Sequence, residues 1–182
     1  MEWLLFLPQL PASPSTLRVM VWRRMRAAGA LGLQNGVWIL HPAQEDFLKE
    51  LEIYLKEHGA ESYSLRTTAQ RSLGDEKIIT RLREERDEEY REFCEKCDDL
   101  LAELHKETQI EKFTFAELEE TEEEVQKLQV WLAKIQRRDV VGASLAKQAQ
   151  QDKQKCEQAL TDFAQQVYRH QGIQNPTGDG KD

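Results

Sequence analysis

Four arginines gather in one short stretch of the sequence. Arg18, Arg23, Arg24 and Arg26 lie within LRVMVWRRMRAAGA, residues 17–30. The planar guanidinium group binds oxyanions through paired hydrogen bonds, so such a cluster is typical of contacts to phosphate or to other anions. The alternative is a solvated helix face whose arginines pair with Asp or Glu elsewhere in the chain. The spacing alone favours neither interpretation.

Cys94-Glu-Lys-Cys97 is the motif that would suggest redox or metal chemistry. It lies in the middle of a helical pattern, without a second CxxC pair or a spaced pair of histidines, so a zinc site lacks ligands. A thioredoxin-type pair would begin a helix after a strand, which this pair does not. Cys97 and Cys156 fall on apolar helix stripes, and we therefore interpret the cysteines as buried structural thiols.

The remaining residues that could do chemistry form no pattern typical of an enzyme. The histidines are scattered and match no metal-ligand spacing: His41, His58, His105 and His170. Neither a Ser-His-Asp or Cys-His arrangement nor a glycine-rich phosphate loop is recognised. We therefore expect a protein that is not an enzyme, with no catalytic residue, no metal and no cofactor.

The chain of 182 residues carries a formal net charge of -8, which is unevenly distributed. Residues 1–73 hold 8 Lys and Arg against 7 Asp and Glu, whereas residues 74–182 hold 17 against 26. The acidic second part is not expected to bind nucleic acid along its length. Three cysteines make no disulfide framework, which fits a reducing cytoplasm. Because no secretory signal or bilayer-spanning apolar run is recognised, we expect a cytoplasmic protein without a membrane partner.

Residues 1–73 switch between strand and helix patterns and predict an α+β lobe. In chain order the predicted elements are a strand at 3–7, a helix from Ser15 or Thr16 to about Ala28, a hairpin whose Asn35-Gly36 turn joins a short strand to a strand at 37–40, a helix from Pro42 to Gly59, and a strand at 61–67. This βαββαβ order is that of the ferredoxin-like fold. The apolar face of the first helix is predicted to hold Leu17, Val21, Trp22, Met25 and Ala28.

The ferredoxin-like fold places its first and third strands at the centre of the sheet, and these are the runs that are apolar on both faces. In the last strand Tyr63 and Leu65 share one face, while polar residues alternate with them, as expected of an edge strand. Apolar residues on both faces of the central strands imply that something covers the face opposite the two helices. The C-terminal lobe could do so, or a second subunit in a homodimer.

Residues 74–172 predict three long helices in an antiparallel bundle packed on the first lobe. Asp75 could cap the first helix, whose apolar stripe is broken only at Arg86. Thr114–Glu117 reads TFAE, a capping box that predicts the start of the second helix. Residues 173–182 are polar and predict a disordered tail.

Two sequence signatures identify a family resemblance. The first is LRVxVWRR followed by G-V-W, and the second, about a hundred residues further on, is KFTFAELEE followed by R-D-x-x-G-A. With these signatures the chain resembles the N-terminal region of the chromate-resistance regulator ChrB, from Trp3 to about Tyr168. The first lobe also resembles the central domain of the phenylacetate repressor PaaX.

The resemblance implies a chromate-responsive transcriptional regulator of repressor type, which binds the operator DNA of chromate-resistance genes. The basic helix of the family matches Arg18, Arg23 and Arg24, with Arg26 as a further candidate. Chromate is a tetrahedral dianion and a candidate ligand. The start of the first helix, at Ser15 and Thr16 beside Arg18, is a chemically reasonable cradle for such an oxyanion.

The chain departs from the family pattern in two ways. Family members often carry a basic residue where Met20 stands, and longer members have a further C-terminal domain. If that domain contributes to sensing, this chain would bind DNA without chromate control or act beside a separate partner. The alternative function is a non-catalytic protein-interaction module, whose acidic helices bind a protein and which acts with a separate chromate-sensing partner. Nuclease activity is not expected, because Pro8–Pro11 stand where related nucleases place an aspartate. No helix-turn-helix is recognised, so the element that reads DNA bases stays open.

Overall fold

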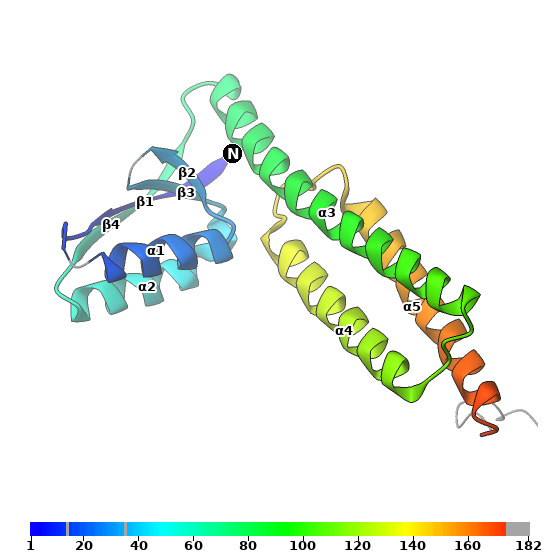
Figure 1. The fold of residues 1–182 in the computed structure, drawn as a ribbon. Helices are drawn as coiled ribbons and strands as arrows, with labels where there is room; N and C mark the ends of the chain where they lie inside the picture. The colour runs from blue at the N-terminus through cyan, green and yellow to red at the C-terminus, as the bar shows by residue number, and fades with distance from the viewer. Residues whose placement is uncertain (14, 35, 174–182) are drawn as a thin grey trace, which may run out of the picture. The chain divides into compact units, whose positions relative to one another are not determined.

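The computed structural model of the chain describes all residues except 14, 35 and 174–182 (Figure 1). Over the described residues it contains a four-stranded antiparallel sheet and five α-helices, which confirms the predicted α+β class. Contacts divide the chain into unit 1, residues 1–85 and 138–142, and unit 2, residues 86–137 and 143–182. The division falls inside one long helix, whereas the sequence predicts a boundary at residue 73. Except for its first residue, the predicted tail lies outside the described part, as does Asn35 of the predicted turn.

Unit 1 contains the sheet and two of the helices. Its elements are β1 (Glu2–Gln9), α1 (Thr16–Ala27), β2 (Leu31–Gln34), β3 (Val37–Leu40), α2 (Glu45–Glu57), β4 (Glu61–Thr68) and the start of α3 (Ser72–Gln109). A short 3-10 helix, Pro42–Gln44, leads into α2. The strand order is β2-β3-β1-β4. The first and third strands are therefore central, as predicted, and β2 and β4 are the edges.

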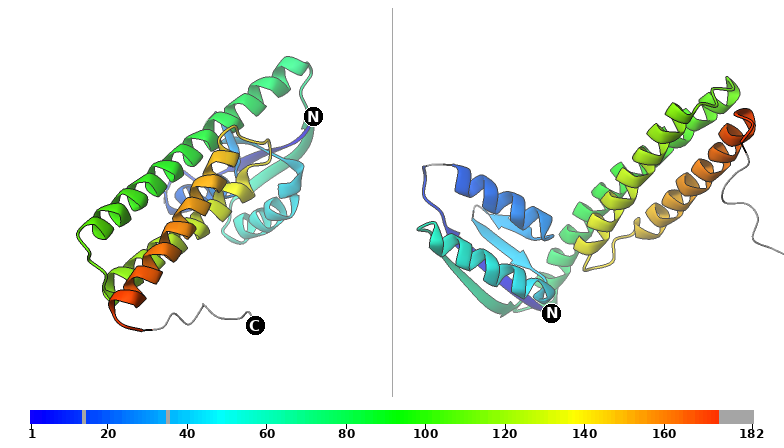
Figure 2. Two further views of the ribbon diagram at one scale, coloured as in Figure 1. Left: turned by 90° about the vertical axis from the view of Figure 1, so that its right-hand side faces the viewer. Right: turned by 90° about the horizontal axis from the view of Figure 1, so that it is seen from below.

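The two faces of the sheet have different covers. Helices α1 and α2 lie side by side on one face (Figures 1 and 2). Because side chains alternate along a strand, Leu4 and Phe6 point to these helices, whereas Trp3 points to the opposite face. The core below the helices contains Leu4, Phe6, Val21, Met25, Ala30, Leu40, Leu48, Leu51, Leu55 and Ala60. On the opposite face a smaller cluster joins Trp3, Leu31 and Ile39 to Leu82 of α3, with Ile78, Ile79 and Val141 around it.

Asp75 connects β1 to α3 and does not cap the helix as predicted. Helix α3 begins three residues earlier, at Ser72, so Asp75 lies in its first turn. There its carboxylate accepts a hydrogen bond of 2.7 Å from Nε1 of Trp3. The capping prediction is wrong because the helix already includes Ser72, Leu73 and Gly74 before Asp75. The carboxylate of Asp75 instead accepts from the indole N–H of Trp3, which would otherwise lack a partner.

Gly29 ends α1 in a conformation that only glycine adopts easily. Its φ is +76°, and a Cβ built there would lie 3.0 Å from the carbonyl oxygen of Arg138. We expect Gly29→Ala to lower the free energy of unfolding of unit 1 by about 2 kcal/mol, because the left-handed backbone alone costs about 1–2 kcal/mol for an L-residue. Urea denaturation measures the change. Gly59→Ala is the matched control, since Gly59 has a φ of +71° but nothing within 4 Å of its Cβ position. Equal losses in the two variants would contradict the role of the Arg138 contact.

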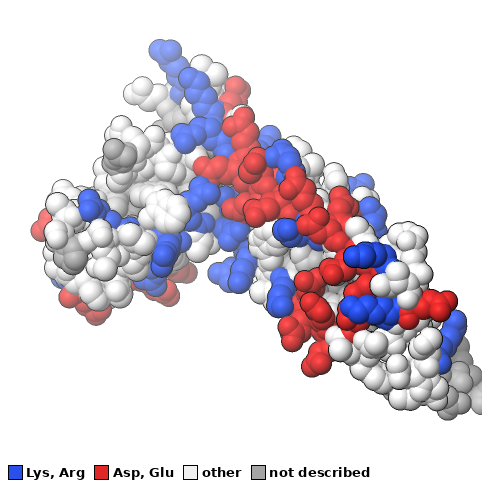
Figure 3. All heavy atoms as spheres, viewed as in Figure 1, with Lys and Arg blue, Asp and Glu red and all other residues white. Residues whose placement is uncertain are grey.

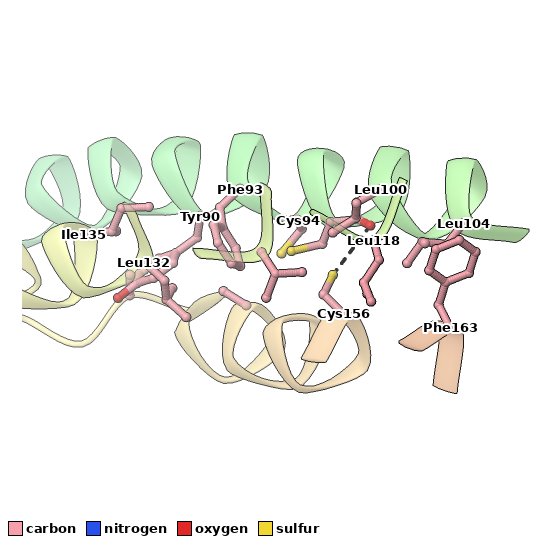
Figure 4. Close-up of a cluster of buried hydrophobic side chains, with 14 of the residues drawn as sticks. Tyr90, Phe93, Cys94, Leu100, Leu104, Leu118, Leu132, Ile135, Cys156 and Phe163 are labelled. Carbon is pink, nitrogen blue, oxygen red and sulfur yellow. Dashed lines mark hydrogen bonds between the residues drawn. The ribbon is translucent and has the colours of Figure 1, made fainter. Parts of the chain in front are cut away.

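The described part of unit 2 contains helices whose buried apolar side chains form one core (Figure 4). They are α3 from Arg86 onward, α4 (Phe115–Arg138) and α5 (Ala146–His170). The backbone N–H of Glu117 donates to Oγ1 of Thr114 at 3.2 Å, which confirms Thr114 as the cap of α4. Arg86, which breaks the predicted stripe, is 2% exposed and forms an ion pair with Glu89 at 3.2 Å. None of the described helices is long and apolar enough to cross a bilayer.

Candidate nucleic-acid and oxyanion interface

Helix α1 presents the predicted arginines on a helix that contains no carboxylate. Its sequence, TLRVMVWRRMRA, has four arginines and neither Asp nor Glu. Only Val21 and Met25 are fully buried, which leaves a broad outer surface. Because α-helical side chains that are three or four positions apart are neighbours, Arg18, Trp22 and Arg26 form one row, in which Arg26 is half-buried, and Arg23 lies beside it.

Arg18 and Arg23 are the exposed arginines of α1. Nη2 of Arg18 donates a hydrogen bond of 2.6 Å to the carbonyl oxygen of Ala12, which holds this side chain near the start of the helix. For Arg23 the described part of the chain gives no hydrogen bond or ion pair. The guanidinium of Arg23 can therefore meet an external anion without breaking a contact in the protein.

Arg24 and Arg26 have partners within unit 1. The guanidinium carbon of Arg24 lies 5.4 Å from the ring centroid of Tyr54 on α2, a cation–π contact. Nη1 of Arg26 forms an ion pair with Oε2 of Glu85 on α3 at 2.6 Å. The interpretation that the arginines pair inside the protein thus holds for Arg26. In the structure the four arginines are therefore not equivalent, because two of them already have partners within unit 1.

The prediction that Trp22 lies on the apolar face of α1 is wrong. Its side chain is 55% exposed, whereas Val21 beside it is 1% exposed. Each residue turns the helix by about 100°. The line from Val21 to Met25 faces the sheet, so Trp22 turns outward between Arg18 and Arg26. An exposed aromatic ring among arginines is typical of nucleic-acid surfaces, where rings stack on bases and cations meet the backbone. The signal in the sequence that indicates this exposure is the position of Trp22, four residues after Arg18 and four before Arg26.

The predicted oxyanion cradle lies at the other end of α1 from most of the arginines. Ser15 and Thr16 are exposed, and Ser15 occupies the cap position without a side-chain hydrogen bond to the helix. The first backbone N–H groups of α1 lie at this end, where the helix dipole favours an anion. At a rise of about 1.5 Å per residue, Thr16 and Arg23 are separated by about 10 Å. Arg18 is the arginine that this end can use.

The three cysteines lie in the core of unit 2, as predicted. Cys94, Cys97 and Cys156 form no disulfide and are at most 7% exposed. Cys94 and Cys156 point into this core in Figure 4. Burial raises the pKa of Cys94 to about 12. A hydrogen bond with Cys156, together with burial, also raises the pKa of Cys97. The two thiols therefore stay protonated and unreactive, since the thiolate is the nucleophile and metal ligand. Within the described residues no group of three or more His, Cys, Asp or Glu could hold a metal ion.

The negative charge of the chain belongs to unit 2. Unit 1 holds 12 Lys and Arg and 12 Asp and Glu, so its formal charge is zero; the other 13 and 21 leave -8 on unit 2. Many acidic side chains, with Lys and Arg between them, are visible along the long helices (Figure 3). The arginine-rich helix is thus part of the electrically neutral unit, where a polyanion meets less repulsion.

The family model of the N-terminal region of protein ChrB matches residues 18–174, which includes α1 from Arg18 onward and the described helices that follow it. No curated protein matches the chain.

Proposed function

The chain belongs to the ChrB N-terminal family, and from this premise we propose that it is a chromate-responsive regulator of chromate-resistance genes that binds operator DNA through α1. The observation that carries the proposal is the outer surface of α1, where Arg18, Trp22 and Arg23 are exposed and no carboxylate interrupts them. The proposal extends to the fold: unit 1 is ferredoxin-like, and unit 2 is a three-helix antiparallel bundle. A non-enzymatic role and a cytoplasmic location complete it, the latter supported by three buried free thiols.

In this proposal the arginines of α1 have different roles. Arg18 and Arg23 neutralise backbone phosphates, which positions the protein on DNA without reading sequence. Arg24 is held against Tyr54 and supports the positive potential of the helix. Arg26 must exchange Glu85 for a phosphate if it is to contribute a direct contact. Trp22 supplies an apolar surface for a base or a sugar.

Chromate would act at the start of α1. A tetrahedral dianion accepts hydrogen bonds there from the first N–H groups of the helix, from the Ser15 and Thr16 hydroxyls, and from Arg18. Arg18 cannot bind chromate and a DNA phosphate at the same time. Bound chromate would therefore weaken DNA binding and release the genes from repression.

Fluorescence anisotropy with labelled DNA from upstream of the protein's own operon tests the proposal. We expect specific binding that weakens with salt, with the slope of log affinity against log salt falling by about 0.9 when one phosphate contact is removed. Arg23→Ala should show this loss. Arg24→Ala is the matched control: it removes a neighbouring arginine that is held on Tyr54, so its slope should stay near that of the wild type. Absence of binding at low salt, or equal slopes for all three proteins, would contradict DNA binding through α1.

The chromate arm uses the same titration. Addition of chromate should release the DNA from the wild-type protein, and sulfate, which is also a tetrahedral dianion, is the control for ordinary competition by anions. Binding that is indifferent to chromate would move the sensing step to a separate partner. It would leave α1 as the DNA-binding element.

A second candidate function rests on unit 2. A groove of about 500 Å³ lies on α3 and α4, lined by the apolar Leu100, Leu128 and Trp131 together with charged side chains. Lys96 at its rim already pairs with Asp99 at 2.9 Å, so the groove favours an apolar occupant over a free anion. This observation supports a non-catalytic interaction module that binds a chromate-sensing protein partner through its acidic helices. Trp131→Ala should then abolish capture of that partner while DNA binding stays unchanged.

A further inference from the structure

The two edges of the sheet differ in how they are protected. Strand β2 has four residues and an irregular register between Gly32 and Gln34, and Arg81 donates to the carbonyl oxygen of Gly32 at 2.9 Å. Strand β4 has eight residues and pairs along its whole length with β1, in a regular register. Short edge strands and irregularities are devices that prevent pairing with another chain. Strand β4 has neither of them.

The open edge also carries exposed apolar side chains. Tyr63 and Leu65 are 52% and 54% exposed. They lie opposite Leu7 and Leu5 in the sheet register, so all four share the face that is turned away from α1 and α2. The cluster around Trp3 and Leu82 covers another part of this face and does not include these residues. An edge and an apolar surface therefore coincide at β4.

We propose that a second copy of this chain pairs with β4, strand against strand and antiparallel, about a twofold axis at Ser64. In that register Tyr63 of each copy lies opposite Leu65 of the other, and the two pairs join Leu5 and Leu7 in one apolar layer. A twofold interface uses the same surface on both subunits and must be complementary to itself. The alternating sequence of β4 has this property, because residues equally distant from Ser64 share one face of the sheet.

The charges of β4 agree with this register. Arg66 lies opposite Ser62 of the other copy, and Glu61 lies opposite Thr67, so no like charges meet. Arg66 is already neutralised by Glu45 and by Glu2, the latter at 3.0 Å. A twofold axis at Leu65 would instead place Tyr63 opposite Thr67 and lose both tyrosine–leucine pairs. Pairing through unit 1, whose formal charge is zero, also lets two chains of net charge -8 associate by their neutral parts.

The proposed axis is perpendicular to the sheet. The product is one eight-stranded antiparallel sheet with both copies of α1 and α2 on the same face. This inference stands without the proposed function, because it is independent of DNA and of chromate.

Disulfide crosslinking of the full chain tests the register. Directly opposed residues of antiparallel strands have Cα atoms about 4.5–5.5 Å apart, within the disulfide range of about 4.4–6.8 Å. Ser64→Cys should therefore form a covalent dimer in oxidised glutathione, which oxidises the two thiols to one disulfide. Thr68→Cys is the matched control: it is exposed on the same strand, but its symmetry mate would be about 27 Å away. The native cysteines are buried and should not interfere.

Mass measurement by light scattering gives the second, independent readout. We expect the wild-type chain to show twice the 21.2 kDa of one copy. The double variant Tyr63→Lys/Leu65→Lys should be a monomer with an unchanged circular dichroism spectrum, because both side chains are exposed. Mixing it with Tyr63→Glu/Leu65→Glu should restore the dimer mass. A monomeric wild type, or a dimer that Ser64→Cys does not crosslink, would overturn the proposal.

Discussion

Replacing Trp3 by alanine is expected to lower the free energy of unfolding of unit 1 by about 4 kcal/mol. Trp3 is 0% exposed and packs with Leu31, Ile39 and Leu82 on the face of the sheet opposite α1 and α2. Its indole N–H also donates to Asp75. The variant removes a large apolar volume and leaves that carboxylate without the indole donor. Because a small domain is stable by only about 5–15 kcal/mol, much of the stability of unit 1 would be lost.

Urea denaturation followed by far-UV circular dichroism measures this loss, and hydrogen exchange of β1 and β3 assigns it to unit 1. Trp22→Ala is the matched control, because the same residue type is exposed there and should cost less than about 0.5 kcal/mol. Trp3→Phe keeps most of the packing and separates it from the hydrogen bond. Equal effects of Trp3→Ala and Trp22→Ala would contradict the assignment of Trp3 to the core.

The order of elements in unit 1 could be predicted because it depends on local signals. The alternation of strand and helix patterns and the positions of Gly29 and Gly59 are readable along the chain, and both glycines adopt positive φ as helix ends require. The central strands were recognised by apolar residues on both faces, and they occupy the centre of the sheet. The start of α3 was misplaced because Asp75 resembles a cap, whereas its actual partner, Trp3, is 72 residues away.

The candidate interface could be predicted only as a set of residues. The residue pattern predicts the helix and shows its arginines. It does not show the partners of Arg24 and Arg26, because these lie on α2 and α3. The orientation of Trp22 depends on which line of α1 faces the sheet, and its hydrophobicity alone favoured the wrong side. Likewise, alternation in β4 showed that Tyr63 and Leu65 share a face, but it could not show that α3 leaves that part of the face open. Each failure concerns a contact between distant segments.

The position of the negative charge answers why an acidic chain can carry a basic helix. Counted over the whole chain, the charge argues against DNA binding. Counted by unit, the charge of -8 belongs to unit 2. Helix α1, which contains no Asp or Glu, belongs to unit 1, whose formal charge is zero. Electrostatic screening limits interactions between exposed charges to about 8–10 Å at ordinary salt, so the local balance matters more than the total. The same neutrality favours association of two chains through unit 1.

Two glutamates at the α3–α4 connection are expected to make unit 2 less stable as pH rises. Glu107 is 8% exposed, and its pKa is raised from 4.5 to about 7 by burial and by its hydrogen bond with Glu117. Glu117 has a lowered pKa, because it accepts from Glu107 and from Lys112, whose Nζ lies 2.5 Å from its carboxylate. The protonated carboxyl of Glu107 is thus the donor, and Glu117 is the charged acceptor.

The sign follows from proton binding. Between pH 4.5 and 7 folded Glu107 holds a proton that the unfolded chain has released, so stability falls as pH rises through this window. Glu117 acts in the opposite direction, but only below pH 4.5. At about 1.4 kcal/mol per pH unit, Glu107 lowers the free energy of unfolding by about 3 kcal/mol at most between pH 4.5 and 8.

Glu107→Gln keeps a donor for Glu117 and cannot ionise. We expect it to be more stable than the wild type at pH 8, about equal at pH 4.5, and nearly insensitive to pH between them. Urea midpoints across this range measure the effect, and Glu103→Gln, an exposed change one turn earlier on α3, should keep the wild-type slope. A Glu107→Gln variant with the wild-type slope would show that Glu107 is ionised in the folded protein. In that case Lys112, 3.7 Å from Glu107, would pair with both carboxylates.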